Sequence, residues 1–138
     1  MYSHILLAGG DSRAARHAMD VAIAFAAQQH ARLHALCVLT PQPAVGVLAD
    51  VLLGDPPADR ATRRAERVLA RVRESAARAG VPCEVERVFD RRPYAAIIGA
   101  AAKRCCDLIV MGAHGGPPAD DAARKVMLHG DVPVLICR

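Results

Sequence analysis

The stretch Asp107–Gly116, DLIVMGAHGG, decides the fold that we expect for this chain. Its apolar run Leu108–Met111 is typical of a buried strand in a parallel sheet, and the glycines around His114 indicate a turn directly after it. The backbone N–H groups of such a turn lie at the carboxyl edge of the sheet, where open α/β sheets bind their ligands. We therefore expect any small-molecule site to lie at this turn.

Further apolar runs and helical patterns alternate along the rest of the chain. The predicted strands are His4–Ala8, Leu33–Leu39, Val81–Phe89, Leu108–Met111 and Val132–Cys137. The predicted helices begin at Asp11 or Ser12, at Asp59 (ending at Ala79, before Gly80), at Pro93, and at Asp120 or Asp121 (ending at Leu128, before Gly130). Five strands alternating with four helices predict one α/β domain over residues 1–138, a doubly wound three-layer sandwich with right-handed crossovers around a parallel sheet.

The composition excludes several classes of protein. The chain has 138 residues, of which 53% are hydrophobic and only 3% aromatic, so one core of Ala, Val, Leu and Ile is expected. Few aromatic side chains leave little surface on which bases stack, and a net charge of +4 is mild, so we expect no nucleic-acid partner. The sequence has neither a long apolar span nor a leader, which predicts a cytoplasmic protein without a membrane partner.

The cysteines and histidines do not indicate a metal site. The five cysteines have no CxxC spacing and the six histidines have no HxH or HExxH spacing. We expect free, reduced thiols. The adjacent pair Cys105 and Cys106, near a predicted helix end, is the exception, because partial exposure makes such thiols oxidisable.

Two segments are candidates for partner surfaces. Residues 40–59 contain four prolines around an apolar island at 44–54, which is either a docking patch or a short helix packed back on the domain. The predicted helix at 59–79 carries a row of arginines at helical spacing, namely Arg60, Arg64, Arg67, Arg71 and Arg78. This row is either a solvated face, with Glu66 and Glu74 as local partners, or a surface for an acidic partner.

Four segments, in order and at similar spacing, resemble the universal stress protein (UspA-like) family. They are HILLAGGDS, RRPYAAIIGAAAKRC, DLIVMGAHG and KVMLHGDVPVLICR. The resemblance implies a five-stranded parallel sheet of order 3-2-1-4-5, an adenine nucleotide alpha hydrolase-like and Rossmann-like fold. It also implies a homodimer in which the last strands, here Val132–Cys137, pair antiparallel.

One branch of that family binds ATP through a loop of the form G-x2-G-x9-G-[ST], and the other branch does not bind it. Gly112 and Gly115 match the first half of the loop, but Lys125 and Val126 occupy the positions of the second Gly-[ST] pair. Alignment on the downstream KVMLHG places Asp120 and Asp121 there instead. Two carboxylates at a helix start repel a triphosphate, and Pro117 and Pro118 remove two N–H donors, so this loop is degenerate.

The resemblance marks a weak nucleotide site, if any, at the carboxyl edge. Its residues would be Gly9, Gly10, Asp11, Val38, Gly112, His114 and Gly115. The family's acidic residue after the first strand is displaced here to Asp11. The sequence offers one set of side chains suited to catalysis, namely Asp11, Ser12 and His114. Nothing in the sequence places these side chains within hydrogen-bond reach of one another. We therefore predict that the chain has no catalytic residue and no metal site, and that it is not an enzyme.

We therefore expect a stress-response protein that works as a homodimeric interaction module, without a cofactor and without tight ATP binding. A protein partner at 44–54 is part of this expectation. The alternative is a switch that responds to an adenine nucleotide, ATP or AMP with Mg²⁺, held by the remaining half of the loop.

Overall fold

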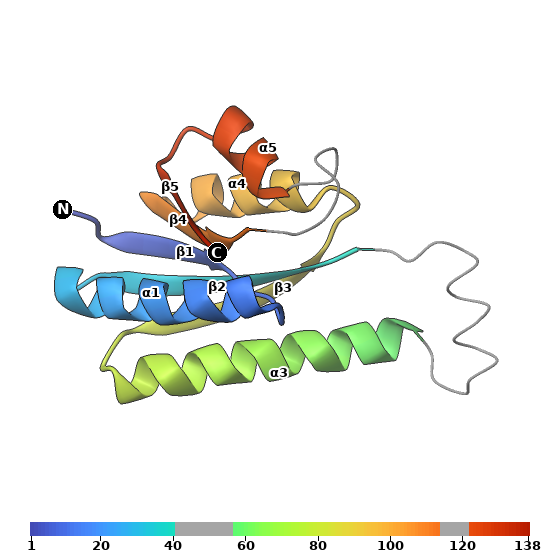
Figure 1. The fold of residues 1–138 in the computed structure, drawn as a ribbon, viewed down its shortest axis with the longest axis horizontal. Helices are drawn as coiled ribbons and strands as arrows, with labels where there is room; N and C mark the ends of the chain where they lie inside the picture. Colours follow the sequence, from blue (N-terminus) through green and yellow to red (C-terminus); the bar gives the residue numbers. More distant parts are fainter. Residues whose placement is uncertain (41–56, 114–121) are drawn as a thin grey trace.

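Five parallel strands form one sheet in the computed structural model, which describes residues 1–40, 57–113 and 122–138 (Figure 1). The strands are β1 (His4–Ala8), β2 (Arg32–Leu39), β3 (Cys83–Phe89), β4 (Leu108–Gly112) and β5 (Val134–Cys137). Their order, β3-β2-β1-β4-β5, confirms the expected 3-2-1-4-5 sheet. The chain runs outward from β1 to β3 and then returns to the other side of β1. The topological switch, where such sheets form a crevice, therefore lies between β1 and β4.

The described helices cover both faces of this sheet (Figure 1). On one face lie α1 (Arg13–Gln29) and α3 (Pro57–Arg78), and on the other lie α4 (Pro93–Lys103) and α5 (Ala122–His129). Successive side chains of β1 alternate between the two cores: Ile5 and Leu7 pack on the side of α1 and α3, and Leu6 on the side of α4 and α5. The inner strands β1 and β4 are buried on both faces, which explains their continuous apolar sequences, whereas the edge strand β3 alternates with charged residues.

Helix starts follow local sequence signals. Ser12 is the N-cap of α1, because its Oγ accepts a hydrogen bond of 3.1 Å from the backbone N–H of Ala15. Of the two candidates at this helix start, Asp11 and Ser12, the cap is therefore Ser12. Helix α4 begins at Pro93, as predicted. The predicted start of α3 at Asp59 is wrong: the helix begins at Pro57, since proline fits the first helical turn.

Prolines set the starts of the two edge strands. We expected strands from Val81 and Val132, but β3 begins after Pro82 and β5 begins after Pro133. Each proline still accepts through its carbonyl, Pro82 from the N–H of Leu33 at 2.9 Å and Pro133 from the N–H of Ile109 at 3.0 Å. Proline has no N–H to donate in return, so regular pairing starts only beyond it.

Only one of the expected acidic partners on α3 stays within the helix. Glu74 pairs with Arg78 at 3.9 Å, as predicted for neighbours on one helix. Glu66 instead pairs with Arg87 on β3. The apolar island at 44–54 lies outside the described residues. Of the helices described, none combines the length and the apolar character needed to cross a bilayer.

Candidate functional site

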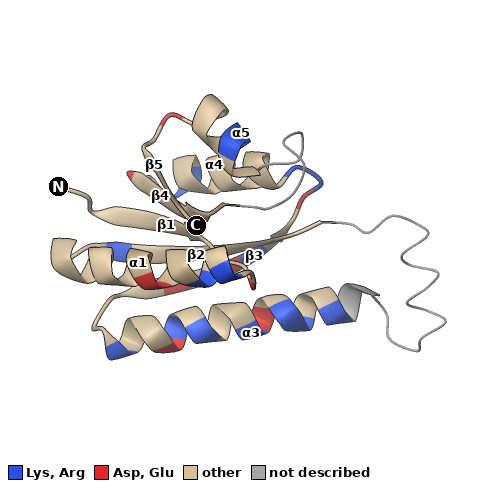
Figure 2. Cartoon of the chain, viewed as in Figure 1, with Lys and Arg blue, Asp and Glu red and all other residues tan. Residues whose placement is uncertain are grey.

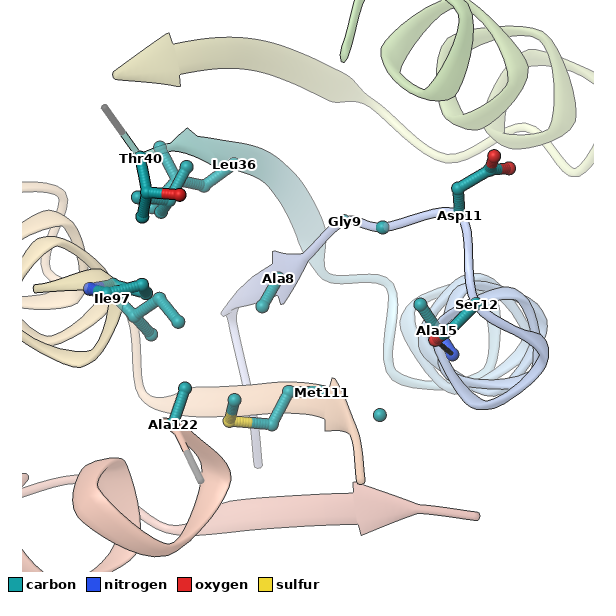
Figure 3. A pocket seen from close by; sticks show the side chains of 14 residues that line it. Ala8, Gly9, Asp11, Ser12, Ala15, Leu36, Thr40, Ile97, Met111 and Ala122 are labelled. Atoms are coloured by element: carbon teal, nitrogen blue, oxygen red, sulfur yellow. Dashed lines mark hydrogen bonds between the residues drawn. The ribbon is translucent and has the colours of Figure 1, made fainter. Parts of the chain in front are cut away.

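A cavity of about 280 Å³ opens at the carboxyl edge of the sheet, at the switch between β1 and β4 (Figure 3). The ends of β1, β2 and β4 and the first turns of α1, α4 and α5 surround it. Its lining residues include Ala8, Gly9, Gly10, Asp11, Leu36, Val38, Thr40, Pro93, Ile97, Met111, Gly112 and Ala122. The walls are mainly aliphatic. Polar side chains line the cavity at Asp11 and Ser12, in the turn after β1, and at Thr40, directly after β2.

The structure brings most of the predicted site residues to this cavity. Gly9, Gly10, Asp11, Val38 and Gly112 all line it, although they come from three different strand ends. His114, Gly115 and the carboxylates Asp120 and Asp121 lie outside the described residues. Pro93, Ile97 and Ala122 also line the cavity and were not predicted. The helices that carry these residues begin at this edge of the sheet. No local motif indicates them, but the predicted strand order could have placed the starts of these helices beside the cavity.

Gly112 has a packing role that does not depend on any ligand. A Cβ atom at this position would lie 2.6 Å from the backbone carbonyl carbon of Ala14 and 2.6 Å from the backbone nitrogen of Ala15. The end of β4 therefore packs directly against the first turn of α1, and glycine is the residue that allows this approach. The glycine pattern alone cannot distinguish this requirement from phosphate binding.

The turn after β1 is also closely packed. A Cβ atom at Gly9 would lie 3.2 Å from the sulfur of Cys37, and one at Gly10 would lie 3.0 Å from the Cβ of Ala15. The backbone N–H of Gly9 donates to the carbonyl of Leu36 at 2.8 Å, so it is not available to a ligand. Both glycines line the cavity, and each allows the turn to pack closely against its neighbours.

The carboxylate of Asp11 is already paired. Its Oδ1 accepts from Arg16 at 3.1 Å and lies 3.7 Å from a guanidinium nitrogen of Arg71 on α3. The hydrogen bond from Arg16, with the nearby charges of Arg71 and Arg64, holds the pKa of Asp11 below its ordinary value. In Figure 3 the side chain extends from the turn toward α3 and away from Ile97 and Met111 on the opposite side of the cavity. Asp11 is therefore ionised and directed toward arginines.

Ser12 and Asp11 are the two described members of the constellation that the sequence offered for catalysis, and both have other partners. The Oγ of Ser12 is committed to the cap of α1 and the carboxylate of Asp11 to arginines, so neither is placed to act on the other. Within the described ranges, no three His, Cys, Asp or Glu side chains gather in a way that would bind a metal ion.

A second cavity, of about 250 Å³, adjoins the first on the α3 side of the same turn. It shares Gly9, Gly10, Asp11, Val38 and Thr40 with the first cavity, and it adds residues of β2 and α3, including Cys37, Ala61, Arg64 and Val68. Burial raises the pKa of the Cys37 thiol to about 11, so this thiol is a neutral part of the wall. The sequence predicted a row of arginines on this helix that includes Arg64 and Arg71. The helical spacing alone does not show that these two side chains lie near Asp11.

Comparison with known proteins agrees with this architecture. The family-wide sequence model of the Universal stress protein family matches residues 1–138. A relative from Thermus aquaticus, the universal stress protein in the QAH/OAS sulfhydrylase 3′ region, is 35% identical over 147 residues, which cover the whole of both chains.

Solved structures of similar proteins share the fold. A universal stress protein family member from Burkholderia pseudomallei has a TM-score of 0.78 at 29% identity, over 98% of this chain and 95% of that one. A universal stress protein in complex with cAMP has a TM-score of 0.76 at 23% identity, over 99% and 97% of the two chains. At that identity, the second likeness concerns the fold alone. On its sequence and its sheet topology, this chain belongs to the universal stress protein family.

Proposed function

We propose that this universal stress protein acts as a homodimeric interaction module in the stress response and does not bind ATP tightly. The observation that carries the proposal is the pairing of Asp11 with Arg16 and Arg71. In the nucleotide-binding branch of the family, the acidic residue after the first strand helps to hold adenosine. Here the nearest carboxylate is one residue further on and is directed toward α3.

The sequence of the loop after β4 supports the same proposal. The Gly-[ST] pair of the nucleotide loop is missing, and Asp120 and Asp121 occupy its place when the downstream helix is aligned. Gly112, which matches the motif, is accounted for by its contact with α1. Of the glycines in the family's nucleotide loop, this chain therefore keeps Gly112, which has a packing role of its own, and Gly115.

The homodimer is supported by the apolar surface around the last strand. β5 is an edge strand, and its side chain Leu135 is exposed. Met127 and Leu128 on the preceding helix are also exposed. An edge strand with unpaired backbone groups and apolar neighbours favours pairing with a second copy. In this proposal the protein acts in the stress response through contacts of its surface with a second copy and with partners, and not through a chemical reaction.

Thermal unfolding with and without ATP and Mg²⁺ tests the lack of tight binding. A ligand present at 100 times its dissociation constant adds about 2.7 kcal/mol to the stability of the folded state. We expect no shift in melting temperature at millimolar ATP, and a clear upward shift would overturn the proposal. Inorganic phosphate alone, at the same ionic strength, separates nucleotide recognition from plain anion binding.

A second candidate function is a nucleotide-responsive switch that binds ATP or AMP with Mg²⁺. The cavity at the topological switch favours it, because Val38, Ile97 and Met111 form apolar walls that suit a base. The cAMP complex of a protein with this fold also favours it. Adenosine distinguishes the two candidates: the switch predicts saturable binding that Ile97→Glu removes, and the interaction module predicts none.

A further inference from the structure

The net positive charge of the chain is concentrated on one helix. α3 contains seven arginines and three acidic residues, and the remaining eleven basic and eleven acidic residues of the chain cancel. The net charge of +4 is therefore the charge of α3. Figure 2 shows these basic positions in blue along the part of α3 that is coloured by charge.

Two arginines of α3 reach the turn after β1. Arg71 approaches the Oδ1 of Asp11 at 3.7 Å, and Arg64 lines the second cavity together with Asp11. Arg16, from the first turn of α1, donates to the same Oδ1 at 3.1 Å. Two guanidinium groups from two helices thus approach one carboxylate, and a third, that of Arg64, lines the adjoining cavity. Together the three arginines carry two more positive charges than Asp11 balances.

The surroundings of this cluster suit a small ligand. Arg16, Arg71 and Asp11 are all partly open to solvent, so an anion can reach them. The adjoining cavity of about 250 Å³ has an aliphatic wall at Val38 and Val68 and a hydroxyl at Thr40. The thiol of Cys37 is neutral there and does not repel an anion.

We propose that Arg16, Arg64 and Arg71 form a binding site for the phosphate group of a small phosphorylated molecule, whose organic part enters the cavity between β2 and α3. A phosphate monoester carries close to two negative charges at neutral pH, which balances the cluster. Guanidinium groups bind phosphate oxygens through paired N–H donors, so arginine is well suited to this role. The site lies on the α3 side of the Gly9–Asp11 turn, and the first cavity, which the end of β4 lines, lies on the other side. It goes beyond the proposed function and does not depend on it.

Titration of the folded protein with inorganic phosphate at pH 7.5 and constant ionic strength tests the site. The arginine Nε–H resonances in ¹H–¹⁵N spectra report which side chains respond. We expect saturable shifts of Arg16, Arg64 and Arg71, and at least a tenfold weaker affinity in Arg71→Gln and in Arg64→Gln. The matched control is Arg78→Gln, which removes the same charge from the end of the same helix and should leave the affinity within twofold.

The variant Asp11→Asn should change the affinity for phosphate in the opposite direction from the arginine variants. Because the carboxylate competes with phosphate for the same guanidinium groups, its removal should tighten phosphate binding severalfold. Glu74→Gln removes the same charge from α3 beside Arg78, away from the cluster, so it reports the general effect of charge and should leave the affinity within twofold. The proposal is overturned if the shifts do not saturate, if all three arginine variants weaken binding equally, or if Asp11→Asn leaves the affinity unchanged.

Glycerol phosphate tests the organic part of the ligand. It should bind more tightly than inorganic phosphate, and Val68→Glu in the cavity wall should remove this difference while inorganic phosphate still binds. Equal affinity for the two anions in the unmodified protein contradicts the role of the cavity. Because the phosphates of ATP can also reach these arginines, the ATP melting test is repeated in Arg71→Gln. A shift that persists in this variant contradicts the proposed function, and a shift that is lost with Arg71 reports this site, so the two can fail separately.

Discussion

The Nε2 atom of His34 lies 2.9 Å from the Oε2 atom of Glu86, which joins a buried imidazole on β2 to a carboxylate on β3. Arg104, at the end of α4, donates to the same oxygen at 3.3 Å. The side chain of His34 is only 1% exposed. Among the described residues, its Nδ1 and the Nε of Arg104 have no hydrogen-bond partner. Glu86 is the nearest carboxylate to both side chains, since Glu84 lies further away, at 4.0 Å from His34 and 3.7 Å from Arg104.

Replacement of Glu86 by Ala should destabilise the protein by about 1–3 kcal/mol, because it leaves a buried imidazole without its partner. Glu84→Ala is the comparison, because Glu84 lies two residues away on the same face of β3 and forms only the longer pairs with His34 and Arg104, at 4.0 Å and 3.7 Å, from a side chain that is 75% exposed. Its effect should stay within about 0.5 kcal/mol. Urea unfolding measures both, and equal losses would contradict the role of Glu86.

Stability should fall steadily as the pH drops below neutral. Burial lowers the pKa of His4 from its ordinary value of 6.5, and the hydrogen bond with His34 lowers the pKa of Glu86 from 4.5. Burial acts to raise the pKa of Asp107, but hydrogen bonds from Ser3 and His4 outweigh it and hold the pKa below 3.8. All three groups bind protons more weakly in the folded state, so acid favours unfolding.

The His4 contribution should be lost as the pH falls through and below 6.5, and the carboxyl contributions below 4.5. His4→Gln isolates the first of these, because glutamine stays neutral. Its free energy of unfolding should vary less between pH 7 and pH 5, while the loss at lower pH remains. An unchanged slope in that interval would count against burial of a neutral His4.

Two glycine substitutions should have opposite effects. Gly112→Ala places a Cβ atom 2.6 Å from the backbone of α1, and we expect a loss of about 1–3 kcal/mol. Gly99→Ala, within α4, meets no atom within 4 Å and should stabilise the protein by about 0.5–1 kcal/mol. Chemical denaturation measures both changes. A neutral Gly112→Ala would show that the contact between β4 and α1 relaxes easily.

A charge on the last strand should separate the proposed dimer. Leu135→Glu places a carboxylate on the exposed edge strand β5, where pairing with a second copy would bury it. Phe89→Glu is the control, because Phe89 is an exposed apolar residue on the opposite edge strand, β3. Sedimentation equilibrium should show monomers for the first variant and dimers for the second. Dimers in both would rule out pairing through β5.

The five cysteines should differ widely in reactivity. Cys105 is exposed, whereas Cys37 and Cys106 are buried, and burial raises the pKa of each of the latter thiols to about 11. Because the thiolate is the reactive form, a thiol reagent at pH 8 should modify Cys105 first. Cys105→Ser should remove the fastest phase, and Cys37→Ser should preserve it. Persistence of that phase in Cys105→Ser would contradict this order.

The adjacent cysteines that the sequence analysis named therefore differ in burial: Cys105 is exposed and Cys106 is buried. Cys105 has a φ of 54°, a left-handed conformation that ends α4 and turns the chain toward β4. The sequence predicts the helix end, but the burial of Cys106 depends on the core formed with α4 and the sheet. The spacing of the cysteines and the composition of the chain do not predict that Cys106 is buried in this core.

The sequence by itself determined the strands, the helices and the family of this protein. Apolar runs of strand length, the cap at Ser12 and the first-turn proline at Pro93 are local signals, and each acts over a few residues. Errors occurred at strand starts, where Pro82 and Pro133 delay the regular pairing. The candidate cavity also followed from the sequence, because parallel strands end at a common edge.

Only the tertiary structure decided what the residues at that edge do. Asp11 pairs with Arg71, which lies sixty residues further along the chain, and Gly112 is needed because α1 packs against it. Glu66 pairs with Arg87 of the sheet rather than with a neighbour on its own helix. These contacts depend on the distance and angle at which whole helices pack on the sheet. Local sequence patterns carry no information on that geometry, so the direction of each charged side chain was fixed only by the fold.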